Sequence, residues 1–531
     1  MIFPSFKRLL PLWFALGGLA FAIWLHVFLN DAKRPLVPQE RADRLAAENY
    51  LAGSFTAPVP PSPAHWAQLL VRQDLQSGAR YPLARQAAAL AIAACGGNNV
   101  AASALAFAAA AASLAWLLGR SASLGAGHKA LLVAMTLTGV AHGRAWQMHD
   151  PFPYLVLAAA TFALGAWLQL RDTPTKAKSR LLAFSFVGLV LCHETLGILF
   201  GLVVARDAFI GRGEAPAGAR SLQRIRPLGT TLLVMVVLLA GFGLRNYLVV
   251  GDALKTPAGD YSDRNVTAPD WFWKSLIAPP ARLDPVFERY DELVALPNAN
   301  WSTPVYRSWF ERIYEGTFYA GGLALALAAL AAALILPGRV TRPPVLLVLG
   351  LIAISFLRYS YSSSWWPLAT PALLLLAALG LAHLVSATSP KWAGKLLAAI
   401  ALLQLATLPT APQAKPTAAE YGFATRIKEV AEKVAEKPGS HLIFVRLDDD
   451  ADGRIEPANL ARDWASKPLL FARDLGSERN AALAAEMSDR TPWRIIIFKD
   501  RIGLQPWTKT LDTKPSAQPV PPAASVPTPA I

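Results

Sequence analysis

Long apolar segments recur along most of this 531-residue chain. About twenty consecutive apolar residues suffice for a helix to cross the hydrocarbon core of a bilayer. The pattern therefore predicts a mainly α-helical, polytopic membrane domain over residues 1–412, with about ten spans. The apolar runs lie at 10–29, 99–118, 129–142, 151–170, 228–250, 314–336, 343–357, 366–386 and 396–410.

One further apolar stretch, 181–205, has basic segments on both sides, at 171–180 and 206–226. Because positively charged loops favour the cytoplasmic face, a single span here would place one basic loop outside. We therefore expect a short re-entrant hairpin of two helices. His193 and Glu194 lie at its centre, and an ionisable pair at that depth is a functional-site candidate. The alternative is a paired structural His-Glu at the hairpin tip.

Two long polar loops, 30–98 and 251–312, are expected on the external side. The second is rich in aromatic residues, which favour the membrane–water interface; a small self-packed external subdomain is the alternative. Both loops interrupt the apolar pattern for far longer than an ordinary connection between helices requires.

The pattern changes after the last apolar run. Strand-like segments occur at 441–445, 468–472 and 494–498, with a helical segment at 477–487. They predict a small external α/β domain within 413–510. The tail after it, 511–531, is rich in Pro, Ala and Ser and is expected to be disordered.

Composition and charge support a membrane protein. Hydrophobic residues make up 54% of the chain and charged residues 16%, whereas soluble domains carry about 25% charged residues. The formal net charge is +15, and the excess lies in loops assigned to the cytoplasm, as the positive-inside pattern requires. Membrane lipids are therefore expected partners, and nucleic acid is not. Lys7 and Arg8 before the first run place the N-terminus inside and the C-terminal domain outside.

Two carboxylates are candidates for chemistry. Glu40 lies in a helical segment, 39–52, at the start of the first external loop, where it shares one face with Arg44 and Glu48. It could act as a general base or a metal ligand, or belong to a solvated helix face. Asp150 precedes Pro151 at the outer end of a predicted span, and is either a functional carboxylate or an ordinary helix N-cap.

Two arginines near the outer ends of predicted spans are candidates for binding an anion. They are Arg245, followed by Asn246, and Arg358, followed by Tyr359. The guanidinium fork matches phosphate geometry, so both could face a lipid phosphate. The alternative is that they anchor their helices at the membrane interface.

The layout of a first span, an external loop with an acidic helix, many spans and an external C-terminal domain resembles the GT-C membrane glycosyltransferases. This superfamily includes the protein O-mannosyltransferases and lipid A aminoarabinose transferases, of the family 39 and 83 types. The chain is most similar to bacterial members without an established function. The matching segments are 40–58, Arg80-Tyr81-Pro82, 245–254 and 441–473.

The resemblance implies sugar transfer from a polyprenyl-phosphate donor to a glycan, lipid or protein acceptor, at the external face of a bacterial inner membrane. It implies catalytic roles for Glu40 and Asp150. It also implies substrate-binding roles for Tyr81, Arg245, Arg358, Tyr359, His193 and Glu194.

The superfamily often carries an Asp-Glu pair where this chain has Gln39-Glu40. An amide cannot act as a base at neutral pH. A divalent metal could assist such a reaction, but none is predicted with one of the usual acids missing. Two other hypotheses stay open: a non-catalytic scaffold or subunit of an envelope-polysaccharide assembly, and a transporter or flippase.

Overall fold

The structure is a computed structural model that describes residues 16–18, 38–66, 71–74, 79–119, 124–143, 150–172, 175–192, 194–210, 229–257, 313–314, 316–317, 320–336, 338–357, 363–387, 390–407, 427, 430–447, 461–498 and 502–508. These residues are mainly helical. The chain divides into a helical unit, Met1–Pro58 and Leu69–Thr425, and a C-terminal unit, Val59–Gln68 and Arg426–Ile531.

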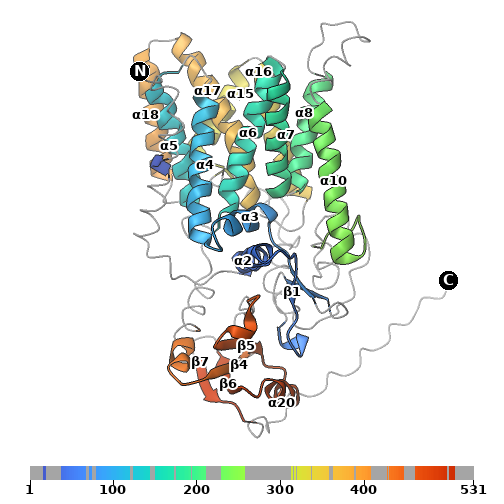
Figure 1. Ribbon diagram of the computed structural model, residues 1–531. Helices are drawn as coiled ribbons and strands as arrows, with labels where there is room; N and C mark the ends of the chain where they lie inside the picture. Colours follow the sequence, from blue (N-terminus) through green and yellow to red (C-terminus); the bar gives the residue numbers. More distant parts are fainter. Residues whose placement is uncertain are drawn as a thin grey trace, which may run out of the picture. The chain divides into compact units, whose positions relative to one another are not determined.

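The helices of the helical unit stand side by side in a bundle, with two shorter helices, α2 and α3, at one end (Figure 1). The core is formed mainly where α6 packs on α4 and α7, and where α15 packs on α17. The helices are α2 (Pro38–Leu51), α3 (Gln86–Ala94), α4 (Asn99–Gly119), α5 (Ala126–Gly143), α6 (Phe152–Asp172), α7 (Lys176–Cys192), α8 (Glu194–Ile210), α10 (Gly229–Val250), α15 (Leu323–Ile335), α16 (Gly338–Leu357), η6 (Ser363–Leu368), α17 (Thr370–Ala387) and α18 (Pro390–Thr407).

Three of the described helical segments are long and apolar enough to cross a membrane. They are Asn99–Gly119, Phe152–Leu170 and Trp366–Ala387. Each coincides with a predicted span, and together they indicate a membrane protein. The larger number of about ten spans stays a prediction, since the first run, 10–29, lies almost wholly outside the described residues.

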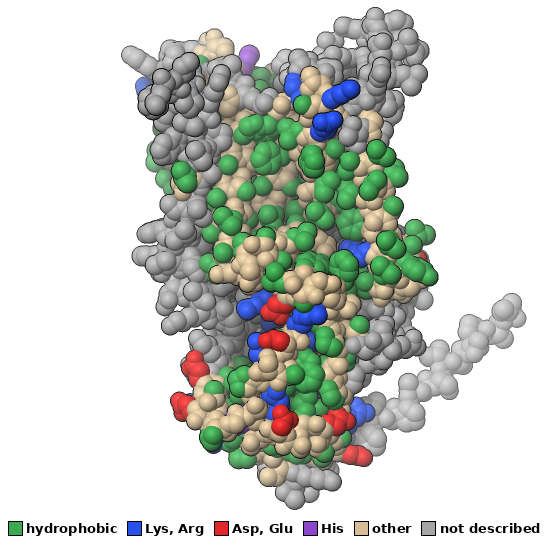
Figure 2. Space-filling view, in the orientation of Figure 1, with side chains coloured by type: hydrophobic (Ala, Val, Ile, Leu, Met, Phe, Trp, Pro, Cys, Tyr) green, Lys and Arg blue, Asp and Glu red, His purple; other side chains and the backbone are tan. Residues whose placement is uncertain are grey.

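The outer surface of the bundle is also suited to lipid. Figure 2 shows hydrophobic side chains over much of the visible face of the bundle. Large aliphatic side chains along α10 are exposed, among them Leu233, Val237, Leu244 and Leu248. Exposing such side chains to water costs about 1.5–3 kcal/mol each relative to burial, so this surface favours an apolar solvent.

The apolar stretch around residue 193 forms two helices, as predicted. α7 ends at Cys192 and α8 begins at Glu194, and the two pack on each other in one core. The close approach depends on Gly197, where a Cβ atom would lie 2.4 Å from Cγ2 of Val190. The hairpin is longer than predicted, because each helix has 17 residues and thus spans about 25 Å. The face from which it enters a membrane stays a prediction.

The loop that follows α2 contains a small antiparallel sheet that the sequence did not predict. Its order is β1-β3-β2, formed by β1 (Ala57–Pro58), β2 (Val71–Asp74) and β3 (Ala79–Pro82). Strands of two to four residues are too short to show a periodic pattern. The sheet holds Tyr81 opposite Arg72 and directs the following residues toward α3.

The C-terminal unit contains a four-stranded sheet with the order β5-β4-β6-β7. β4 (Ser440–Leu447) lies parallel to both β5 (Leu469–Arg473) and β6 (Arg490–Ile497), and β7 (Ile502–Pro506) is antiparallel to β6. α20 (Ser477–Glu486) contributes Leu483 to the core beneath the sheet. The three predicted strands and the predicted helix are therefore present, and β7 is an additional strand.

Residues 59–68, far away in the sequence, also belong to the C-terminal unit. Within them η2 (Pro63–Trp66) places Trp66, which is fully buried, in the core with Leu442 and Phe444. The indole Nε1 donates a hydrogen bond to the carbonyl of Pro61 at 2.7 Å. The first predicted external loop is therefore shared between both units.

His65 makes the stability of the C-terminal unit depend on pH. Its Nε2 lies 3.3 Å from Oδ1 of Asn480, and that oxygen also accepts the N–H of Leu475, so Nε2 carries the proton. Burial lowers the pKa of His65, and the hydrogen bonds with Asn480 and with the Ser62 backbone only partly oppose this.

Because the unfolded chain then binds more protons than the folded one, stability is fully present above the unfolded pKa and decreases as the pH falls below about 6.5. We expect proteolysis of the C-terminal unit in the full-length protein to accelerate between pH 7.5 and 5.5. His65→Gln keeps the donor to Asn480 but cannot be protonated, and should remove most of this pH dependence. Equal acceleration in both proteins would contradict the role of His65.

Candidate functional site

Two carboxylates from distant parts of the helical unit bind one guanidinium. Asp43 lies on α2, Asp150 precedes α6, and Arg85 ends the segment between β3 and α3. Oδ2 of Asp43 accepts hydrogen bonds from Nε of Arg85 at 3.0 Å and from Nη2 at 2.5 Å. Oδ1 of Asp43 accepts the backbone N–H of Arg85 at 2.8 Å. The side chain and backbone of Arg85 are therefore both held by one carboxylate.

Asp150 binds the other edge of the same guanidinium. Nη1 of Arg85 lies 2.9 Å from Oδ2 of Asp150, and Nη2 lies 2.9 Å from Oδ1. Oδ1 also accepts the backbone N–H of Phe152 at 3.0 Å, which caps the N-terminus of α6. The two alternatives for Asp150 are thus compatible, since the residue caps its helix and takes part in a buried ionic cluster.

Burial makes this cluster electrostatically unusual. The exposed fraction of the side chain is 1% for Asp43, 8% for Asp150 and 16% for Arg85. Burial raises the pKa of Asp43; Arg85 opposes this effect and the Asp150 carboxylate reinforces it. Burial by itself would lower the pKa of Arg85, but Asp150 and Asp43 outweigh it and raise that pKa. With both carboxylates ionised, the cluster carries one net negative charge.

Gln39, at the position where the GT-C resemblance expects an acid, supports this cluster. It lies one helical turn before Asp43, and its Nε2 donates to Oδ1 of Asp43 at 3.2 Å and to the carbonyl of Leu83 at 3.3 Å. The amide thus ties α2 to the segment that carries Arg85.

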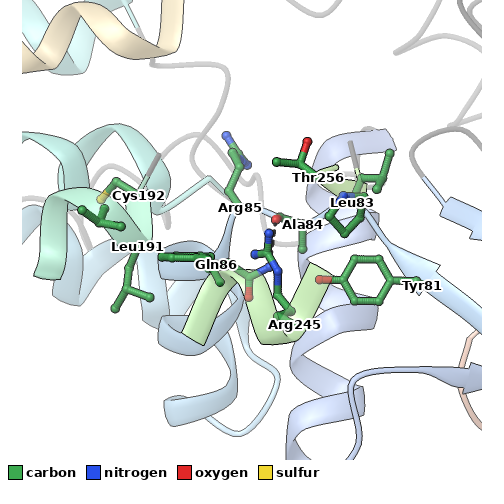
Figure 3. A pocket seen from close by; sticks show the side chains of 12 residues that line it. Tyr81, Leu83, Ala84, Arg85, Gln86, Leu191, Cys192, Arg245 and Thr256 are labelled. Carbon is green, nitrogen blue, oxygen red and sulfur yellow. Dashed lines mark hydrogen bonds between the residues drawn. The ribbon is translucent and has the colours of Figure 1, made fainter. Parts of the chain in front are cut away.

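A cavity of about 170 Å³ opens beside Arg85. Figure 3 shows the side chains of Gln86 and Arg245 near one another in this space, with Tyr81 on one side and Leu191 and Cys192 on the other. Its walls come from β3, the start of α3, the end of α7, the end of α10 and the residues that follow α10. The lining residues are Tyr81, Leu83, Ala84, Arg85, Gln86, Val190, Leu191, Cys192, Phe242, Arg245, Thr256 and Pro257.

Arg245 is held in place at the end of α10. Its Nη2 donates to Oδ1 of Asn246 at 2.9 Å, and its guanidinium carbon lies 4.9 Å from the centre of the Phe242 ring. Asn246 is buried and donates to the carbonyl of Ala253 at 3.2 Å, which fixes the turn after the helix. The cavity therefore has a positioned arginine on α10 and a second one, Arg85, before α3.

The structure brings some of the predicted site residues together. Tyr81 and Arg245 line the cavity, and Asp150 reaches it through Arg85. Glu40 is buried on α2 rather than solvated, but it does not line the cavity. Of the other residues on the predicted solvated face, Arg44 is exposed and pairs with the half-buried Glu48 at 3.3 Å.

The remaining predicted residues are not described. His193, Arg358 and Tyr359 lie outside the described residues, and Glu194 begins α8 but its side chain is not described either. The end of α7 borders the cavity, because Val190, Leu191 and Cys192 contribute to its wall.

Asp43 and Arg85 were missed by the sequence reasoning. A signal for Asp43 was present in the sequence. At helical spacing Asp43 shares a face with Gln39, Ala47 and Tyr50 rather than with Arg44. This face includes a small apolar residue, so it is less typical of a solvated surface. Arg85 is in a non-helical connection, where no periodicity distinguishes a buried arginine from a solvated one.

Comparison with known proteins does not identify a family for this chain. The sequence matches no protein-family model, and no curated protein is significantly similar to it. Among the described residues, no three His, Cys, Asp or Glu side chains are grouped so that they could hold a metal ion.

Proposed function

We propose that this protein is an integral membrane glycosyltransferase. It transfers a sugar from a polyprenyl-phosphate donor to an envelope acceptor, at the external face of a bacterial inner membrane. The observation that carries the proposal is the cavity beside the Asp43–Arg85–Asp150 cluster, which Arg245 also lines. A carboxylate pair and two arginines at one end of an apolar helical bundle provide the groups that this reaction needs.

The cavity suits a phosphate attached to a lipid. Arg245 is fixed by Asn246 and Phe242, and a positioned guanidinium stabilises the charge that develops on a leaving phosphate. Apolar side chains from α7 and α10, Val190, Leu191 and Phe242, line the same space. They offer a prenyl chain a path from the cavity toward the lipid-facing surface.

Asp150 is the better candidate for the base. From described residues, Asp43 accepts hydrogen bonds from Gln39 Nε2 and from N, Nε and Nη2 of Arg85. These four donors fill the roughly four acceptor positions of a carboxylate. Asp150 accepts from Nη1 and Nη2 of Arg85 and from the N–H of Phe152. Among the described residues these three donors leave one of its roughly four acceptor positions for the proton of an acceptor hydroxyl. Asp150 does not line the cavity itself, but it binds Arg85, which does.

In the proposed reaction, the acceptor oxygen bonds to the anomeric carbon while the bond from that carbon to the phosphate oxygen breaks. The hydroxyl proton goes to Asp150, and polyprenyl phosphate leaves beside Arg245. Asp43 acts as a positioning residue that fixes Arg85, and Arg85 in turn orients Asp150.

A non-catalytic scaffold is the second candidate function. Gln39 favours it, because an amide that binds Asp43 stands where the resemblance expects an acid. The two candidates differ in turnover, which a scaffold lacks.

The test is release of polyprenyl phosphate by the purified protein in lipid nanodiscs, screened over polyprenyl-phosphate sugars with an envelope extract as acceptor. We expect release by the wild type. Arg245→Ala should lower it about ten- to one-hundredfold, the value of one charge-assisted hydrogen bond. Arg44→Ala is the matched control, because Arg44 is exposed and paired with Glu48. No release with any donor from folded wild-type protein would favour the scaffold.

A further inference from the structure

The guanidinium of Arg85 occupies the space between two facing carboxylates. Its Nη2 contacts Asp43 Oδ2 at 2.5 Å and Asp150 Oδ1 at 2.9 Å, so one nitrogen bridges both acids. Nη1 donates to Oδ2 of Asp150, and Nε donates to Oδ2 of Asp43. A position shared by two carboxylates is one that a hard divalent cation also favours.

We propose that Arg85 takes the place of a divalent cation between Asp43 and Asp150, so that the site works without a metal ion. The metal-independence of turnover rests on the proposed function. The exclusion of a cation from this position does not, because it depends only on how the three side chains are held.

The residues present do not fit a metal together with Arg85. Mg²⁺ requires close to six oxygen ligands at about 2.0–2.1 Å, whereas the oxygens of Asp43 already accept four hydrogen bonds from nitrogen donors. A metal would have to displace the guanidinium and leave it buried beside a dication.

Displacement of Arg85 is opposed by three further contacts. Its backbone N–H binds Asp43, its guanidinium carbon lies 4.6 Å from the centre of the Phe152 ring, and its side chain is only 16% exposed. The guanidinium of arginine is always charged and is more weakly hydrated than a divalent cation. It therefore loses less hydration free energy when it is buried.

The substitution has a consequence for the chemistry. Two carboxylates with one guanidinium keep a net negative charge, whereas two carboxylates with a divalent cation are neutral. A bridging dication would withdraw charge from both carboxylates and weaken them as bases.

The experiment uses Mn²⁺ as the probe, measured by electron paramagnetic resonance on the full-length protein in nanodiscs of neutral phosphatidylcholine. We expect wild type to bind no Mn²⁺ at this site. Arg85→Ala should gain one site that binds Mn²⁺ at least about tenfold more tightly than wild type does, and adding Asp43→Asn should remove it. Arg245→Ala is the matched control, since it removes an arginine from the same cavity but not from between the carboxylates, and should gain no site.

Two results would overturn the proposal. One is a Mn²⁺ site in wild type that Asp43→Asn abolishes, a measurement that does not require Arg85→Ala to fold. The other is a folded Arg85→Ala protein that binds no more Mn²⁺ than Arg245→Ala. Neither depends on turnover, so an inactive wild type without a Mn²⁺ site would count against the transferase alone. An active wild type with such a site would count against metal independence alone.

Discussion

Asp150→Asn is expected to lower release of polyprenyl phosphate by about 10²–10⁴-fold, the usual contribution of a general base. The variant should still fold, because the amide oxygen of asparagine can accept the N–H of Phe152 that Asp150 Oδ1 accepts at 3.0 Å. The variant also leaves Arg85 paired with Asp43. One carboxylate and one guanidinium then remain, so the cluster is neutral and contains no unpaired charge. The loss therefore reports chemistry rather than stability.

The control for this substitution is Asp252→Asn. Asp252 is exposed just after α10. Within the described part of the chain its carboxylate accepts the N–H of Leu254, which asparagine can also accept. We expect Asp252→Asn to keep turnover within a factor of about two. Equal turnover in both variants would remove Asp150 from the reaction, and a strong loss in both would point to a general effect of surface charge.

Arg85→Met is expected to lower the free energy of unfolding by about 3–5 kcal/mol, because it leaves two buried carboxylates without a counter-charge. Measurement is by thermal unfolding in detergent, followed by tryptophan fluorescence. Combining Arg85→Met with Asp43→Asn and Asp150→Asn removes the unpaired charges and should recover a large part of the loss.

Arg245→Met provides the matched comparison for stability. Arg245 is only partly buried and contacts Asn246 and Phe242. Its removal leaves Asp43 and Asp150 paired with Arg85 and should cost less than about 1 kcal/mol. If Arg85→Met and Arg245→Met unfold at the same temperature as wild type, then the ionic cluster does not contribute to the fold in the way that its geometry indicates.

Much of the architecture could be predicted because it follows from the hydrophobicity of the chain averaged over long segments. The spans that became α4, α6 and α17 are apolar over about twenty residues, so no single position decides them. The division of the apolar run 181–205 into two helices, α7 and α8, could be predicted from the basic residues on both sides of it. The strands β4, β5 and β6 are dense in aliphatic and aromatic residues and were predicted for the same reason.

The site was harder to predict because it depends on single residues. The sequence favours Glu40, because it shares a face with Arg44 and Glu48 and matches the acidic pair of the GT-C resemblance. In the structure both Glu40 and Asp43 are buried on α2, and it is Asp43 that binds Arg85. Arg85 gains its role from contacts with Asp43 and Asp150, which lie 42 and 65 positions away in the sequence. Asp150 and Arg245 could be named because each lies at the end of an apolar run, where a charged residue is conspicuous.

The division of the first external loop between two units could not be predicted either. Trp66 sits in a Pro-rich segment with no hydrophobic period, and its burial depends on Leu442 and Phe444. Such a long-range contact cannot be recognised from the residues near Trp66 in the sequence. It is revealed only when both segments are seen in one core.

The most direct test of the account is an experimental structure of the protein in nanodiscs with bound polyprenyl phosphate. The central claim is that the cavity beside Arg85 and Arg245 holds the phosphate of the donor lipid. It predicts a phosphate within hydrogen-bond distance of the Arg245 guanidinium, with the Asp43–Arg85–Asp150 cluster intact beside it. A phosphate bound elsewhere, with this cavity closed or filled by side chains, would contradict the claim.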